Sequence, residues 1–406
     1  MAVGLPEKPV LLSVNGVRLA ACSAGLYRKE RPDLALIACD SGAIASAVFT
    51  RNAFCAAPVR VARQHIRKSP IRYCVVNAGN ANAGLGERGY DDSMAICRRL
   101  SQLAACPMEA ILPFSTGVIG EPLPVDKICD ALPRLLDALS ENAWLEAARA
   151  MMTTDTVPKG ISRQCRIGGR QITITGIAKG SGMISPDMAT MLAFIATDAD
   201  VDRTVLDHVL CRAIDRSFNR ISVDGDTSTN DACTLIATGK SRAPRIDSAA
   251  GREVGEFYEA LEEVCVSLAQ AIVRDGEGAT KFVTIDVRGG LSQTECRSIA
   301  TAIAHSPLVK TALFASDPNW GRILAAVGRS GVSDLDVSKV AIAINGVGIV
   351  ENGERSPSYT ESRGKEALNE EEITLRIDLN RGIESLLFWT CDLSLDYVRI
   401  NAEYRT

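Results

Sequence analysis

The sequence has 406 residues, of which 45 are basic and 49 acidic, so its net charge is −4. Hydrophobic residues make up 46% and charged residues 23% of it, which excludes the disordered and fibrous classes. A pI near 5.7 without a basic stripe argues against nucleic-acid binding, and no apolar run approaches the ~18 residues of a membrane span. At ~150 residues per domain, the length predicts roughly two or three domains or one two-part unit.

Cysteine and histidine usage narrows the possible chemistry. The 13 cysteines are an odd number, and none belongs to a CxxC motif. Because the N-terminus also lacks a signal peptide, we expect reduced thiols in a cytoplasmic protein. The three histidines, His65, His208 and His305, are far apart in the sequence, which argues against a His-based triad or a His-rich metal site. Any catalysis is therefore expected to rest on other groups.

The predicted elements mix strands and helices without a strict repeat. Apolar or β-branched runs predict strands at residues 33–39, 71–77, 111–115, 170–177 and 191–197. Residues 165–177 predict a hairpin that turns at Gly168-Gly169. Helical spacing of apolar residues predicts helices at 91–105, 124–139, 202–218 and 254–274. Further strands are expected at 281–287, 340–344, 373–379 and within 386–400.

This order of elements predicts an α+β fold in which helices cover sheets. The Gly/Pro cluster at residues 179–186 is the best candidate for a domain boundary. Residues 351–364 are rich in Glu, Ser and Gly and predict an exposed loop.

The densest feature is the segment KGSGMISPDMATMLAFIAT, residues 179–197. Glycines and a Pro-Asp pair precede Thr190, and an uncharged, strand-like run follows it. Thr190 can be read simply as a β-favouring residue. The alternative is a nucleophile whose own α-amino group, released by chain cleavage, serves as its base. An α-amino group titrates near ~7.7–8.0, which suits proton transfer at neutral pH.

Two further motifs have chemical and structural interpretations. STGVIG, residues 115–120, reads as a strand that ends in a Gly-containing turn, or as a set of donors aimed at a developing oxyanion. VNAGNANAG, residues 76–84, resembles a phosphate-cradling loop but lacks the lysine and glycine spacing of nucleotide motifs. We therefore expect a tight structural turn near the site. VDGDTSTND, residues 223–231, lacks the glycine and glutamate of a calcium loop, and we reject that interpretation.

The segment KGSGMISPDMATMLAF resembles the autoprocessing segment of the ornithine acetyltransferase family, the bifunctional glutamate N-acetyltransferases of arginine biosynthesis. The resemblance extends along essentially the whole chain. It is carried by VNAGNANAG (76–84), STGVIGEPLP (115–124), MTTDT (152–156), SFNRISVDGDTSTND (217–231), DGEGATK (275–281), DPNWGRI (317–323) and DYVRINAEYRT (396–406). One departure is Asp187, where the family more often has Asn; we expect a tolerated loop change, although its charge could alter the rate of cleavage.

The resemblance implies a layered α/β/β/α sandwich of the self-cleaving, N-terminal-nucleophile type, related to aminopeptidases. Members cleave themselves before the Thr of MATML, so cleavage is expected between Ala189 and Thr190. The products would be an α fragment, residues 1–189, and a β fragment, residues 190–406, which the family pairs as a heterotetramer with two copies of each. Thr190 is the implied nucleophile and, through its freed amine, the base; Thr116 and Gly117 form the implied oxyanion hole.

The remaining implied residues bind the amino-acid substrate: Thr153, Lys179, Thr190, Glu277, Asn401 and Thr406. Lys179 suits a substrate carboxylate, and Glu277 suits the side-chain ammonium of ornithine. The implied reaction is ping-pong transfer of acetyl from N2-acetylornithine to glutamate. No metal or permanent cofactor is expected, although acetyl-CoA is a substrate of bifunctional members.

Two other functional classes remain as alternatives. A related N-terminal-nucleophile aminopeptidase would share the fold but hydrolyse peptides; the ending INAEYRT and the internal motif DGEGATK favour the transferase. A non-enzymatic, uncleaved binding protein would keep the fold without the chemistry; the intact Thr190 and STG argue against it.

Overall fold

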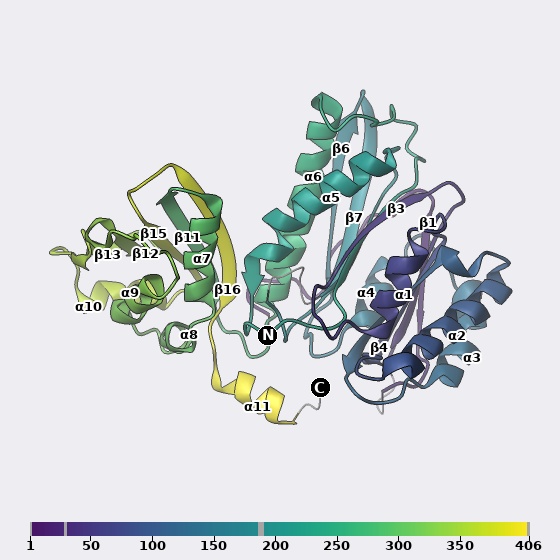
Figure 1. The fold of residues 1–406 in the computed structure, drawn as a ribbon, viewed down its shortest axis with the longest axis horizontal. Coiled ribbons are helices and arrows are strands. Elements are labelled where there is room, and N and C mark those ends of the chain that lie inside the picture. Colours follow the sequence, from purple (N-terminus) through teal and green to yellow (C-terminus); the bar gives the residue numbers. More distant parts are fainter. Residues whose placement is uncertain (1, 28–30, 186–190, 404–406) are drawn as a thin grey trace. The chain divides into compact units, whose positions relative to one another are not determined.

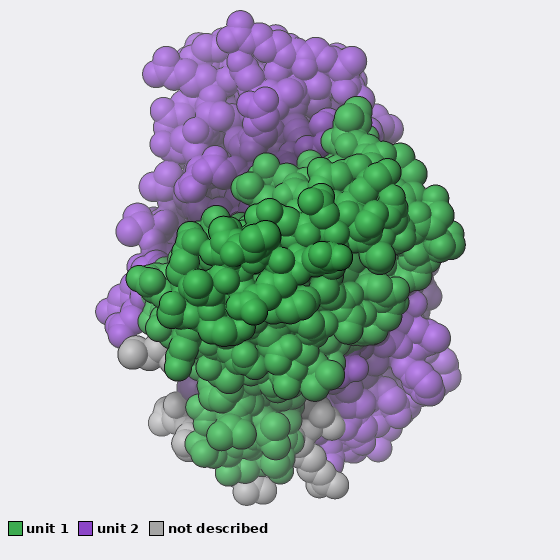
Figure 2. Space-filling view, turned by 90° about the vertical axis from the view of Figure 1, so that its left-hand side faces the viewer, with its two compact units in different colours: residues 1–5, 220–225, 273–404 green, residues 6–219, 226–272, 405–406 purple. Residues whose placement is uncertain are grey.

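The computed structural model describes residues 2–27, 31–185 and 191–403. The chain divides into two compact units (Figures 1 and 2): unit 1 comprises residues 1–5, 220–225 and 273–404, and unit 2 comprises residues 6–219, 226–272 and 405–406. The expected cleavage fragments divide the chain differently, since unit 2 takes residues from both sides of position 190. Residues 179–186, the candidate domain boundary, lie inside unit 2.

Unit 2 contains two sheets. The first has the strand order β1-β2-β4-β5 and the second the order β3-β10-β8-β7-β6. The strands of the first sheet are β1 (Val17–Cys22), β2 (Leu34–Cys39), β4 (Tyr73–Asn80) and β5 (Ile111–Val118). Those of the second are β3 (Ile44–Phe49), β6 (Lys159–Ile167), β7 (Arg170–Lys179), β8 (Leu192–Thr197) and β10 (Ala232–Ala237).

The helices of unit 2 are α1 (Ala57–His65), α2 (Gly86–Ala104), α3 (Val125–Asp137), α4 (Trp144–Met151), α5 (Arg203–Arg216) and α6 (Arg252–Arg274), with 3-10 turns at Met108–Ala110 and Phe218–Arg220. Figure 1 shows α2 and α3 together beside the first sheet and α5 and α6 beside the second.

The two-residue period of β2 explains the layers of unit 2. Leu34 and Leu36 pack with α2 and α3 in one apolar core. Ala35 and Ile37, on the opposite face of the strand, pack in a second core that includes Phe194 of the other sheet. On the far side of the second sheet, the Cα of Gly176 lies so close to side chains of α6 that a Cβ there would be 2.9 Å from Leu268. The order is therefore helix, sheet, sheet, helix.

Unit 1 is a seven-stranded mixed sheet of order β14-β13-β12-β15-β11-β16-β9. Its strands are β9 (Ile221–Ser222), β11 (Phe282–Gly290), β12 (Ala341–Ile344), β13 (Val347–Glu351), β14 (Glu354–Arg355), β15 (Glu372–Asp378) and β16 (Glu384–Cys391). Its helices are α7 (Gln293–Ala304), α8 (Pro307–Phe314), α9 (Trp320–Gly328), α10 (Glu361–Leu368) and α11 (Leu395–Glu403), with a 3-10 turn at Val337–Lys339.

One face of this sheet packs against helices. Along β15 exposed and buried residues alternate, and Ile373, Leu375 and Ile377 form part of the core with residues of α7 and α9. No helix among the described residues is both long enough and apolar enough to cross a membrane.

The structure confirms the predicted α+β class and corrects several bounds. All the strands expected between residues 33 and 197 are present, as is the hairpin formed by β6 and β7. Helix α2 begins at Gly86, five residues before the predicted start. The predicted loop at 351–364 contains the short strand β14 and the start of α10. The strand expected within 386–400 is β16, and α11 follows it.

Candidate active site

The STG motif ends β5, which runs parallel to β4. Thr116 is 8% exposed. Gly117 has a φ of 131°, and a Cβ on it would be 2.3 Å from the carbonyl carbon of Gly79 and 2.5 Å from the backbone nitrogen of Asn80. Only a residue without a side chain permits this approach of two backbones. Gly117, the proposed oxyanion donor, must therefore be a glycine because β4 and β5 are in close contact there, where the register of the two strands shifts.

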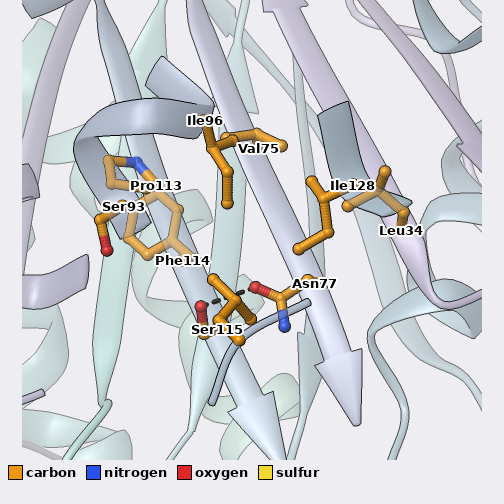
Figure 3. A pocket seen from close by; sticks show the side chains of 10 residues that line it. Leu34, Val75, Asn77, Ser93, Ile96, Pro113, Phe114, Ser115 and Ile128 are labelled. Carbon is orange, nitrogen blue, oxygen red and sulfur yellow. Dashed lines mark hydrogen bonds between the residues drawn. The ribbon is translucent and has the colours of Figure 1, made fainter. Parts of the chain in front are cut away.

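Buried amides hold this strand end in place. The Ser115 hydroxyl donates to Asn77 Oδ1 at 2.6 Å (Figure 3), and Asn77 Nδ2 donates to the carbonyl of Asn80 at 2.9 Å. Asn230 Nδ2 donates to the carbonyls of Ser115 and Ala81 at 2.9 and 2.6 Å. The VNAGNANAG segment, predicted as a tight turn, is instead the end of β4 (residues 76–80) and the start of the loop that follows it. The cavity shown in Figure 3 beside Asn77 and Ser115 holds only about 10 Å³, too little for a substrate.

Lys179 is the last residue of β7, and its ammonium contacts the STG motif. Its Nζ donates to Thr116 Oγ1 at 3.0 Å. An ammonium can only donate, so the Thr116 oxygen accepts and its own hydrogen remains to be donated elsewhere. Two of the residues assigned by resemblance, Thr116 and Lys179, are therefore neighbours, and their contact orients a hydroxyl donor.

Asp155 is a fully buried carboxylate that organises the same region. It accepts from Lys159 Nζ at 2.5 Å, from the Gly180 amide at 2.8 Å and from the Thr153 amide at 2.9 Å. Burial by itself would raise its pKa, but the ammonium groups of Lys159 and Lys179 and the Gly180 N–H outweigh burial and hold the pKa well below its usual range. Asp155 is therefore ionised, and it fixes the backbone of Thr153 and of the residue after Lys179.

A second buried carboxyl, Asp231, lies beside the start of β8. The parallel register pairs Ala232 with Leu192, which places Asp231 level with Met191. Its carboxyl accepts from the Met191 amide and from the Ser228 hydroxyl, while the Thr50 hydroxyl donates to the Ser228 carbonyl at 2.8 Å. Burial raises the pKa of Asp231 well above its usual range, and these hydrogen bonds and the Lys179 charge only partly oppose the shift. A buried carboxyl whose ionisation is disfavoured thus holds the residue that follows position 190.

In unit 1 the DGEGATK motif forms a turn against α11. Glu277 is 7% exposed, and its Oε2 accepts from Asn401 Nδ2 at 2.8 Å. A Cβ on Gly278 (φ 69°) would be 2.5 Å from the backbone nitrogen of Tyr397, so the turn and the helix are in close contact. The hydroxyl of Ser394 donates to the Gly278 carbonyl at 2.6 Å. Glu277 and Asn401, 124 residues apart, are therefore brought together.

The structure groups the predicted site residues into two described sets. Thr116, Gly117, Thr153 and Lys179 belong to unit 2 and are linked by the contacts above, and Glu277 with Asn401 belongs to unit 1. The predictions for Ala189, Thr190 and Thr406 lie outside the described residues.

Four residues of this region were not predicted from the sequence: Asp155, Lys159, Asn230 and Asp231. All four are buried polar side chains, and buried charges of this kind are paired or shifted to the neutral form. Asp155, Asn230 and Asp231 lie inside motifs that the sequence already singles out, MTTDT and DGDTSTND. Membership in these motifs was the signal that could have identified them. Lys159 had none beyond its spacing of four residues from Asp155.

Comparisons with known proteins agree on one family. The family model described as ArgJ family matches residues 18–406. The arginine biosynthesis bifunctional protein ArgJ of Pseudomonas fluorescens (strain Pf0-1) is 55% identical over 406 residues, 100% of each chain. The protein of that name from Methylococcus capsulatus (strain ATCC 33009 / NCIMB 11132 / Bath) is 56% identical over 396 residues, 98% of this chain and 97% of its own.

A solved structure is also similar. The arginine biosynthesis bifunctional protein argJ of Bacillus halodurans is 38% identical, with a TM-score of 0.51. The match covers 53% of this chain and 100% of that one.

Proposed function

This chain belongs to the ArgJ family, and we propose that it transfers the acetyl group of N2-acetylornithine to glutamate in arginine biosynthesis. The observation that carries the proposal is the identity of 55% over the full length with a bifunctional arginine-biosynthesis protein. The same relationship favours acetyl transfer over the aminopeptidase alternative. The word bifunctional in the relatives' name supports a second activity, acetylation of glutamate by acetyl-CoA.

The active protein is proposed to arise by autocleavage between Ala189 and Thr190. The C-terminal product would have 217 of 406 residues, or about 53% of the chain. The solved Bacillus halodurans chain corresponds in full to 53% of this chain, a length that supports the cleavage. The two fragments would then assemble as a heterotetramer.

The proposed reaction has two halves. The Thr190 hydroxyl oxygen attacks the acetyl carbonyl carbon while the freed α-amino group takes its proton. The carbon–nitrogen bond then breaks, the proton passes to the departing nitrogen, and ornithine leaves an acetyl ester on Thr190. In the second half the α-amino nitrogen of glutamate attacks that ester, the threonine oxygen recovers its proton, and N-acetylglutamate leaves.

The oxyanion of each half would be held by Thr116 and Gly117. Because Lys179 donates to Thr116 Oγ1, the hydroxyl hydrogen of Thr116 is available to the oxyanion, and the nearby ammonium makes it a stronger donor. The backbone N–H of Gly117 supplies the second donor. Fixed donors of this kind stabilise charge in the transition state because they do not have to reorganise.

The substrate is proposed to use the remaining residues. Asn401 occupies Oε2 of Glu277, which leaves Oε1 for the side-chain ammonium of ornithine. Thr153, Lys179, Asn401 and Thr406 would contact the amino-acid backbone groups. The chemistry needs no metal or permanent cofactor. All 13 cysteines are unpaired, which supports the proposed cytoplasmic location.

Mass spectrometry tests the proposal directly. The purified protein should give two fragments, with Thr190 at the N-terminus of the second. Incubated with N-acetylornithine and no acceptor, that fragment should gain one acetyl mass. Thr190→Ala should abolish processing and transfer, whereas Thr190→Ser should keep some processing because it retains a hydroxyl on Cβ. An intact single chain with full activity would refute the cleavage. The covalent intermediate would be refuted if no acetyl mass appears and if the double-reciprocal plots of initial rate against the two substrates intersect instead of running parallel.

A further inference from the structure

A large depression lies on unit 2 at the strand ends opposite the STG motif. Its volume is about 760 Å³. It is lined by the turn after β2 and the start of β3, by the segment between α1 and β4, by the residues that follow α2, and by Arg203 of α5. This volume is within the range of roughly 300–1,000 Å³ that ligand sites occupy.

The depression is separate from Thr116. Ala110, in its lining, directly precedes β5, and Thr116 is six residues further along the strand. A strand advances ~3.3 Å per residue, so the two ends are roughly 20 Å apart. A small ligand bound in the depression would not touch the oxyanion donors.

The charged residues that line the depression are all basic. It includes Arg67, Lys68, Arg72 and Arg203 and no acidic residue, although the whole chain carries a net charge of −4. Arg203 is paired with Asp207 at 3.1 Å, and Arg72 Nε donates to the Cys39 carbonyl at 2.9 Å. Among the described residues, the exposed side chains of Arg67 and Lys68 have neither a hydrogen bond nor an ion pair.

Apolar residues form the rest of the wall. Ile44 is half-buried and Pro107 is exposed, whereas Ile66 and Ile71, which also line the depression, are buried. Adjacent unpaired cations favour a doubly charged group such as phosphate. An inorganic phosphate would leave most of the volume empty and the apolar lining without a contact. A phosphate that carries a flat heterocycle would occupy the volume and contact the apolar lining.

We propose that this depression binds a nucleoside phosphate, with the phosphates at Arg67, Lys68 and Arg72 and the base against Ile44 and Pro107. Titration calorimetry of the processed protein with ADP tests the proposal. ADP lacks an acetyl group and a thioester, so the result is independent of acetyl transfer.

The decisive variant is Arg67→Glu with Lys68→Glu. Its control is Arg166→Glu with Arg170→Glu, which makes the same charge change at two exposed residues of the β6–β7 hairpin. That hairpin lies at the edge of the second sheet opposite β3. We expect the Kd for ADP to rise at least tenfold in the first variant and less than twofold in the control. No saturable binding of ADP by the native protein, or an equal change in both variants, would overturn the proposal.

Photolabelling provides a second test that does not depend on a folded variant. Irradiation of the native protein with 8-azido-ADP should modify peptides that contain residues 41–45, 66–72 or 105–107, and excess ADP should suppress the label. Excess adenosine should suppress it far less, because it lacks the phosphates. Label confined to other peptides, or equal suppression by adenosine, would overturn the proposed site.

Discussion

The buried pair of Asp155 and Lys159 gives a prediction whose size follows from the structure. Both side chains are fully buried, and their charged atoms are 2.5 Å apart. Lys159→Met removes one charge and leaves the other without its nearest partner, which costs about 3–5 kcal/mol in comparable pairs. Because Lys179 and the Gly180 amide still face Asp155, we expect about 3 kcal/mol. At ~2–4 °C per kcal/mol, the thermal midpoint should fall by roughly 6–12 °C.

The assay is thermal unfolding followed by circular dichroism, with Arg203→Met as the matched control. Arg203 and Asp207 have the same spacing of four residues but are 43% and 48% exposed, so their loss should cost only ~0.3–0.5 kcal/mol. The pKa of Asp155 lies below its unfolded value, so its stabilisation is complete above about pH 4 and declines as the pH falls further. The stability difference between native protein and Asp155→Asn should therefore shrink from pH 6 to pH 3. Equal midpoints for Lys159→Met and Arg203→Met would refute this reasoning.

Three further predictions concern the two site regions. Glu277→Gln should weaken the transition state for N-acetylornithine by about 1.5–3 kcal/mol and affect glutamate much less, because only ornithine brings a side-chain ammonium; equal losses in kcat/KM would assign Glu277 to shared groups. Asp231→Asn should fold normally at pH 7. Because the raised pKa of the Asp231 carboxyl opposes its ionisation, the native protein should lose stability relative to this variant as the pH rises above about 4. Thermal midpoints of the two proteins that change in parallel with pH would contradict this. Asn230→Ala should lower the free energy of unfolding by about 2–3 kcal/mol in chemical denaturation, because it deprives two buried carbonyls of their donor. A change below 0.5 kcal/mol, roughly that of a surface substitution, would show that the end of β5 does not need Asn230 to keep its position.

The sequence predicted best where local pattern decides the structure. Strands such as β2 and β8 are continuous apolar runs between turn residues, and such runs need no knowledge of distant residues. The helices α7, α8 and α9 were not predicted, although Ser292 and Ser306 cap the first two. Their apolar residues face a sheet that includes strands distant in sequence, such as β15 and β16, and that face is visible only after the sheet has formed.

The candidate site was predictable only by resemblance. No periodicity links Thr116 to Lys179, 63 residues away, or Glu277 to Asn401. Asp155 and Asp231 are both fully buried carboxyls, yet their pKa values move in opposite directions. The difference arises because two ammonium groups face Asp155, whereas mainly neutral donors surround Asp231. Such an environment is a property of tertiary packing, so composition and spacing could not predict in which direction each pKa shifts.

Gly117 allows the position of the proposed oxyanion N–H to be tested separately from backbone strain. Gly117→Ala would place its Cβ 2.3 Å from a backbone carbon of Gly79, so β4 and β5 must move apart and the proposed oxyanion N–H must move with them. Gly120→Ala is the matched control, because Gly120 also has a positive φ, 82°, but nothing lies within 4 Å of its added Cβ. Both variants carry the strain of a left-handed alanine, on the order of 1–2 kcal/mol, but only Gly117→Ala displaces a donor. We expect kcat for acetyl transfer to fall roughly 10²-fold in Gly117→Ala and to stay near native in Gly120→Ala, with folding of both checked by circular dichroism. If the two variants lose activity equally, backbone strain in the STGVIG turn, and not the position of one N–H, would control catalysis.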